Sequence, residues 1–212
     1  MRRSFPGLLA ARAAVVAAAL LLPAAAARAQ SADEVIAKSL EAQGGLAKLK
    51  AIQSIRMTGR ITVGPGIEAP IVIESARPNR MRGEITVQGL TQTVAYDGQG
   101  AWMINPFQGK RDAERLSDDD AAELRDQADL DGPLVDYKAK GSTVELAGKE
   151  AVEGAEAYRL KVTEKDGTVK TFFIDTDSWL PVRLDTRRMV RGTPRETEST
   201  MANYQTVEGM LF

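Results

Sequence analysis

Residues 54–63 read Ser-Ile-Arg-Met-Thr-Gly-Arg-Ile-Thr-Val, and this stretch decides the fold. Apolar and polar side chains alternate along it, which predicts a β-strand with one apolar face and one wet face. The same rhythm returns in residues 67–74 and 80–87, and two further strands are expected at 90–96 and 101–105. Gly-, Pro- and Asn-containing turns separate these runs. The first half of the chain is therefore predicted to be an antiparallel meander of about five strands.

Alternation resumes at Thr143 and continues to Tyr204, giving about ten strands in all. Helices are expected near Ser31, where Glu34 completes a capping box, from Ser117 onward, and in a short segment around residues 134–137. Because strand twist accumulates, a sheet this long must curl. The predicted fold class is mainly β with a few helices (α+β): a strongly curved antiparallel sheet forming an incomplete half-barrel, closed by an N-terminal helix and a mid-chain helical insertion.

The sequence contains neither cysteine nor histidine in its 212 residues. This excludes Cys–His and Ser–His–Asp catalysis, ordinary zinc sites and disulfides. It leaves carboxylate, Lys or Tyr chemistry, or a hard metal on oxygen ligands, for an enzyme. Asp175 and Asp177 are the candidates for a carboxylate hydrolase, but turn preference explains them better. No cofactor, no metal site and no catalytic residue is predicted. Nucleic acid is not expected as a partner, because the exported chain is acidic.

Residues 1–29 are predicted to be a cleaved signal peptide, and residues 30–212 a single domain. Arg2 and Arg3 form a positive start, an Ala/Leu/Val-rich run follows, and Ala27-Arg28-Ala29 fits a cleavage site. Four of the 28 basic residues and none of the 29 acids lie in this segment, so the remainder carries 24 basic and 29 acidic side chains, a net of −5. A lipid anchor needs a cysteine after the cleavage site. The expected location is therefore the periplasm, without an anchor, and the pattern leaves export by the general or the twin-arginine route open.

Several short segments, in this order along the chain, resemble the LolA/LolB-like superfamily of bacterial outer-membrane lipoprotein-sorting proteins. They are Ala32-Asp33-Glu34, Gly44-Gly45-Leu46, Lys48-Leu49, Arg56-Met57-Thr58-Gly59, Tyr96-Asp97-Gly98, the stretch from Trp102 to Phe107, Gly132-Pro133-Leu134, Asp136-Tyr137 and the stretch from Lys149 to Tyr158. The resemblance covers essentially the whole of residues 30–212. It implies a half-barrel that binds acyl chains in its apolar interior, and further strands beyond Phe212.

The function that the resemblance implies is that of a soluble, non-enzymatic carrier. It would shield the acyl chains of lipoproteins or other lipids, between an inner-membrane donor and an outer-membrane acceptor, and is expected to be a monomer. We expect the cavity to be lined by Met57, Ile61, Ile71, Ile73, Met81, Ile85, Trp102, Ile104 and Phe107. Candidate head-group contacts are Arg56, Arg80 and Arg82, although a solvated polar face is the favoured interpretation of these arginines.

Two other classes of function stay open at this point. The first is an envelope sensor or interaction module that binds a membrane partner, since related half-barrels act in stress signalling. The second and least favoured is the carboxylate hydrolase. The sequence does not identify the cargo, the donor or the acceptor.

Overall fold

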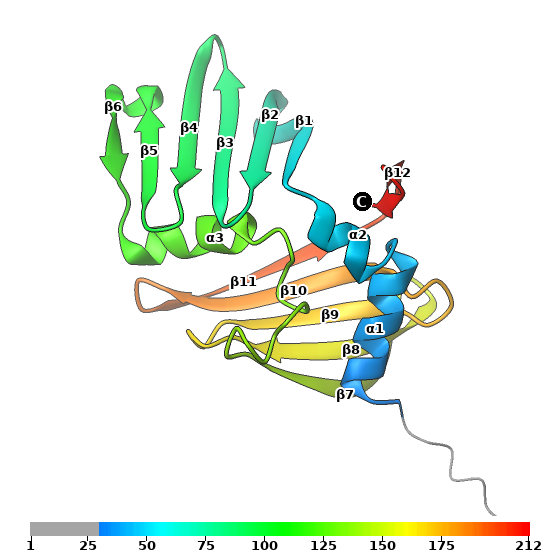
Figure 1. Cartoon of the computed structure of the whole chain (residues 1–212). Helices are drawn as coiled ribbons and strands as arrows, with labels where there is room; N and C mark the ends of the chain where they lie inside the picture. Colours follow the sequence, from blue (N-terminus) through cyan, green and yellow to red (C-terminus); the bar gives the residue numbers. More distant parts are fainter. Residues whose placement is uncertain (1–29) are drawn as a thin grey trace, which may run out of the picture.

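The computed structural model describes residues 30–212, so the predicted signal peptide lies outside the described residues. Figure 1 shows two sheets with helices between and beside them. The helices are α1 (Ala32–Ala42), α2 (Leu46–Ala51), α3 (Asp118–Ala128) and the 3₁₀ turn η1 (Pro106–Gln108). The strands are β1 (Ser54–Gly64), β2 (Ile67–Ala76), β3 (Arg80–Val87), β4 (Leu90–Tyr96), β5 (Ala101–Asn105), β6 (Lys110–Arg115), β7 (Thr143–Val152), β8 (Ala155–Thr163), β9 (Val169–Asp175), β10 (Pro181–Val190), β11 (Thr193–Thr200), β12 (Thr206–Val207) and β13 (Met210–Leu211).

The six-stranded sheet is the predicted meander, in the order β1-β2-β3-β4-β5-β6, with every pair antiparallel. Its first five strands confirm the sequence prediction. The sixth, β6, was not predicted, because its residues Lys-Arg-Asp-Ala-Glu-Arg are all exposed and show no apolar alternation. Such a charged strand is typical of a sheet edge.

The five-stranded sheet has the order β11-β10-β9-β8-β7 and is also antiparallel. The expected single sheet is therefore wrong in one respect, since within residues 30–212 the strands form two large sheets and the small β12–β13 pair. The chain leaves the edge strand β6, passes through α3 and a run of turns, and starts the second sheet at β7. The predicted class of an open, antiparallel, mainly β fold with helices is confirmed.

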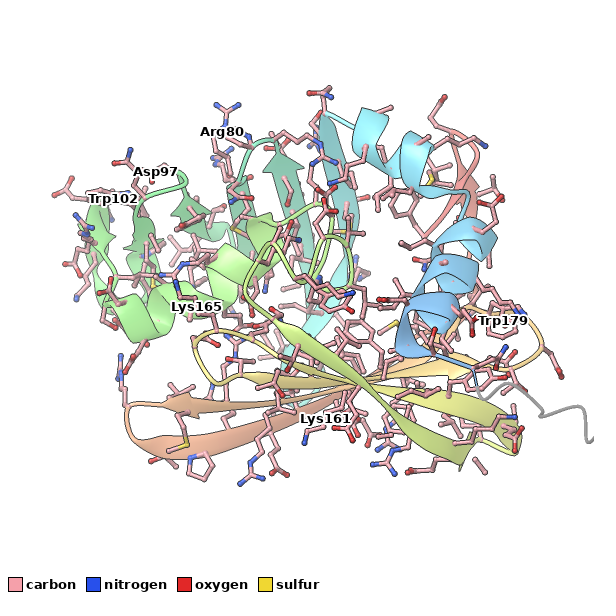
Figure 2. The ribbon with its side chains drawn as sticks, turned by 60° about the horizontal axis from the view of Figure 1, so that its bottom comes forward. Arg80, Asp97, Trp102, Lys161, Lys165 and Trp179 are labelled. Atoms are coloured by element: carbon pink, nitrogen blue, oxygen red, sulfur yellow. The ribbon has the colours of Figure 1, made fainter. Side chains whose placement is uncertain are left out.

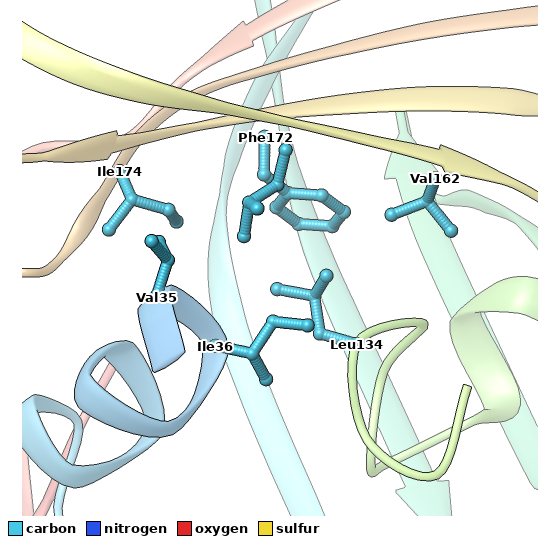
Figure 3. Close-up of a cluster of buried hydrophobic side chains, with 7 residues drawn as sticks. Val35, Ile36, Leu134, Val162, Phe172 and Ile174 are labelled. Carbon is cyan, nitrogen blue, oxygen red and sulfur yellow. The ribbon is translucent and has the colours of Figure 1, made fainter. Parts of the chain in front are cut away.

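The inner face of the five-stranded sheet carries the largest apolar core. α1 lies across it (Figure 1), and Figure 3 shows Val35 and Ile36 of α1 meeting Phe172 and Ile174 of β9. Leu134 packs into the same cluster. Ser31 caps α1 and Glu34 closes the predicted capping box. Trp179 lies beside α1 (Figure 2), with the ammonium of Lys38 4.3 Å from its ring centre.

α3 lies between the two sheets (Figure 1). Ser117 caps it as predicted, and Leu124 and Ala128 are buried against the six-stranded sheet. A second helix was predicted around residues 134–137, and this is wrong, because residues 130–141 form successive turns. The apolar side chains of this segment bury against α1 and the five-stranded sheet without a helix. Across the described part of the chain, every helix is too short or too polar to span a membrane.

Candidate functional site

The most prominent hollow in the described residues lies between the six-stranded sheet, α3 and the β10–β11 hairpin, and has a volume of about 650 Å³. Its apolar floor comes mainly from β2 to β5. The floor residues are Ile71, Ile73, Met81, Ile85, Val94 and Met103. A volume of this size is in the usual range for small-ligand sites, about 300–1,000 Å³. We call this space the cavity.

Strand register gathers the floor residues on one face. Ile71 is opposite Ile85, Ile73 is opposite Gly83, and Gly83 is in turn opposite Val94. Because partners in an antiparallel pair project on the same side, the apolar residues of successive strands form a continuous surface. Gly83 lets the side chain of Val94 pack closely against the sheet, since a Cβ atom at position 83 would lie only 3.2 Å from Val94.

α3 covers the floor with few large side chains. Its buried residues are Ala121, Leu124 and Ala128, so two of the three are alanines. Leu124 reaches the cavity, whereas the alanines bring the helix close to the sheet near Met81 and Tyr96. The small cover leaves space that a bulkier helix face would have filled.

Charged side chains surround the cavity where α3 faces the β10–β11 hairpin. Arg191 donates to Asp120 at 2.6 Å. Hydrogen bonds from Ser117, and secondly from Arg191, hold the pKa of Asp120 below its ordinary value. Arg188 pairs with Asp126, which also lies 3.0 Å from the buried Lys170. These ion pairs fasten the polar side of α3 to the five-stranded sheet. Arg195 also lines the cavity, and no ion pair involves it within residues 30–212.

Comparison with solved structures identifies the architecture. A LolA superfamily protein from Nitrosomonas europaea superposes with a TM-score of 0.53 at 15% identity, covering 86% of this chain and 82% of that one. A DUF1329 family protein from Desulfovibrio piger gives 0.54 at 15% identity, covering 84% and 82%. A domain assigned to outer-membrane lipoprotein sorting from Vibrio parahaemolyticus gives 0.50 at 14%, covering 82% and 81%.

The chain has the LolA-like fold. At such low identity the comparison concerns the fold alone. No family model and no curated protein matches the sequence.

Within this LolA-like fold, four of the nine predicted cavity residues, Ile71, Ile73, Met81 and Ile85, line the cavity. Met57 and Ile61 share their face, because Met57 is opposite Ile73 and Ile61 is opposite Ala69. They belong to the edge strand β1, however, and Met57 is 51% exposed. The alternation in the first three strands therefore assigned the inward face correctly.

The inward face of β5 was assigned wrongly. Met103 is opposite Val94 and lines the cavity, so Trp102 and Ile104 project to the other face of the sheet. Trp102 lies on the outside (Figure 2), with the guanidinium of Arg115 5.9 Å from its ring centre. Phe107 is 45% exposed at the β5–β6 turn, and its neighbour Gln108 lines the cavity instead.

The predicted head-group arginines also lie outside the cavity. Arg56 is opposite Glu74, and Glu74 is opposite Arg82, which places all three on the outer face of the six-stranded sheet. Arg56 approaches Glu74 at 3.6 Å and Arg82 pairs with Glu84. Arg80 lies at the same outer side (Figure 2). This position agrees with a solvated polar face.

Three arginines of the β10–β11 hairpin, Arg188, Arg191 and Arg195, line the cavity. Arg115 borders it too, but its guanidinium lies over the outward-facing Trp102. None of the three hairpin arginines was among the residues predicted for the cavity. The alternation of β10 and β11 is weak, because polar residues occupy both faces of β11. Only the packing of the β10–β11 hairpin against α3 brings them to the cavity.

The carboxylates proposed for a hydrolase have a structural role in the β9–β10 turn. Asp175 accepts hydrogen bonds from the backbone and hydroxyl of Ser178, both at 2.7 Å, and these bonds hold its pKa below its ordinary value. Neither Asp175 nor Asp177 lines the cavity. The pair is explained by the turn it stabilises.

Proposed function

We propose that the protein is a soluble periplasmic carrier that shields the acyl chains of lipoproteins or other lipids. The observation that carries the proposal is the apolar floor of the cavity, formed by the buried Met81 and by half-buried side chains of β2 to β5. The LolA-like fold supports the same function by analogy. Cargo would be an acylated lipoprotein or lipid.

Burial of hydrocarbon supplies the binding energy in this proposal. Each CH₂ group removed from water contributes about 0.8 kcal/mol. Ile71, Ile73 and Ile85 offer an apolar wall that water solvates poorly, so an acyl chain gains by covering it. A lipid with exposed acyl chains could not cross an aqueous compartment at any useful concentration without such a cover.

A guanidinium group at the cavity can bind the polar end of the cargo. Arg195 forms no ion pair among the described residues, and a phosphate or carboxylate would supply its counter-charge. The apolar floor and this arginine together suit an amphipathic anion. No bond is made or broken in this function, so the protein acts by binding and release.

The proposed path runs from an inner-membrane donor to an outer-membrane acceptor. The predicted signal peptide directs the chain to the periplasm, and the sequence contains no cysteine that could carry a lipid anchor. For loading and release α3 has to move from the floor, because Leu124 packs against it.

Native mass spectrometry of the protein purified from its own envelope tests this function. We expect a species heavier than the polypeptide by the mass of one or more acylated molecules, and organic extraction should recover the same molecules. A protein that carries no acyl lipid, and that takes up none when mixed with phospholipid vesicles, would rule out the carrier.

A further inference from the structure

Four large apolar side chains project from one end of the six-stranded sheet. Val63 and Ile67 flank the β1–β2 turn, Leu90 follows the β3–β4 turn, and Phe107 lies in η1 between β5 and β6. Alternate turns of a meander lie at the same end, and Figure 1 shows these three turns together at the end remote from the five-stranded sheet. Their exposed fractions are 43%, 44%, 43% and 45%. We call these four residues the hairpin-tip row.

The three turns contain no charged residues. Residues 63–67, 87–90 and 105–109 contain no Asp, Glu, Lys or Arg, although such residues make up 27% of the chain. The charges that follow are mixed, with Glu68 after the first turn and Lys110 and Arg111 after the third. Uncharged apolar tips can enter the boundary between head groups and acyl chains without burying a charge.

Local geometry fixes the apolar side chains in their exposed positions. Gln88 and Gly89 both have positive φ, at 50° and 79°, as in a tight two-residue hairpin turn. The hydroxyls of Thr86 and Thr91 approach to 2.9 Å across that hairpin. These constraints keep Leu90 at the tip and prevent its collapse onto the sheet.

The arrangement of the row favours a membrane over a protein partner. Stable protein interfaces need a continuous surface of about 800 Å² on each partner. Three separate hairpin tips offer isolated apolar side chains rather than a continuous surface. Isolated side chains can insert between the lipids of a bilayer.

We propose that the hairpin-tip row inserts into the head-group region of an anionic bilayer while the carrier exchanges its cargo. Ile85 and Gln92 on the β3–β4 hairpin, and Asn105 and Gln108 beside the third turn, line the cavity next to the row. An acyl chain would therefore pass between bilayer and cavity with little exposure to water. The role in exchange rests on the proposed function, whereas the membrane contact itself does not.

Flotation with vesicles of phosphatidylethanolamine and phosphatidylglycerol tests the proposal. Leu90→Ser with Phe107→Ser should weaken vesicle binding about tenfold, because two exposed apolar side chains are lost. The matched control is Leu46→Ser with Met189→Ser, which removes side chains of α2 and β10 that are exposed to 43% and 63%, and should bind as the wild type does. Phe107→Trp should retain binding and show a blue shift of its fluorescence on vesicles.

The outcomes separate this inference from the carrier function. If the wild type does not float with these vesicles, or if the control pair loses as much binding as the tip pair, the membrane contact is overturned, and a protein partner becomes the explanation of the row. If the wild type floats with the vesicles, the tip variant does not, and the protein never contains acyl lipid, the membrane contact stands and the carrier function fails. The unfolding midpoints of both double variants should match the wild type.

Discussion

The two large sheets carry the same alternation of apolar residues but use it differently. On the five-stranded sheet, Leu160, Val162 and Ile174 are 0% exposed beneath α1 and Leu134. On the six-stranded sheet, Ile71 and Ile85 stay half-buried around the cavity. The difference lies in the cover, because α1 offers Val35 and Ile36 whereas α3 offers alanines and one leucine. A sheet face becomes a core or a binding site according to the helix above it.

The largest expected effect is loss of stability in the closed region. Leu160→Ala removes a fully buried side chain and should lower the free energy of unfolding by about 3 kcal/mol. Ile85→Ala removes a half-buried side chain beside existing space and should lower it by less than about 1 kcal/mol. Urea unfolding of the two variants measures both values. Equal losses would mean that the two sheet faces do not differ as described.

The second effect concerns Asp131, which joins the two regions. Arg77 beside β3 donates to it at 2.6 Å and Lys50 of α2 at 2.7 Å, and the Arg77 hydrogen bond is the main reason that the pKa of Asp131 falls to about 2. A lowered folded-state pKa stabilises the fold above the ordinary value near 3.8, and this stabilisation is lost as the pH falls towards 2.

Asp131→Asn should therefore lower the free energy of unfolding by about 2 kcal/mol at pH 7, and the deficit should shrink to about half at pH 3. Unfolding curves of wild type and variant at both pH values measure this. A deficit that is independent of pH would show that the Asp131 carboxylate does not act through its charge.

The third and smallest effect concerns the ion pairs that fasten α3 to the five-stranded sheet. Asp126→Asn removes the charge partner of Arg188, while Lys170 keeps Glu164 at 2.7 Å. The variant should lose about 1 kcal/mol, and amide exchange should accelerate in α3 but not in α1. Exchange measured by mass spectrometry distinguishes the two helices. Unchanged exchange in α3 would mean that its apolar contacts alone hold it.

Much of this fold could be predicted from the alternation of apolar and polar residues along the strands. The alternation predicted ten of the strands, and the register places Val144 opposite Val162 and Leu146 opposite Leu160. β6 escaped prediction because an edge strand with charges on both faces has no apolar pattern. The split into two sheets depends on long-range pairing, which local periodicity does not encode.

The cavity residues were predictable only where the two faces of a strand differ in polarity. β2 and β3 are apolar on one face, and their cavity residues followed from the sequence. In β5, Trp102, Met103 and Ile104 are all apolar, so alternation alone could not decide which of them points inward. Register with Val94 decides it in favour of Met103. The arginines at the cavity were beyond prediction because the packing of separate elements brings them there.

The carrier proposal is tested most directly by adjacent substitutions on opposite faces of one strand. Val94 lines the cavity, whereas Ala95 is opposite Arg82 and Trp102 on the outer face. Titration with a fluorescent fatty acid should show saturable binding by the wild type, a loss of at least about tenfold in Val94→Glu, and wild-type binding in Ala95→Glu. Equal binding by both variants, or equal loss, would contradict the assignment of the cavity as the site of the acyl chain.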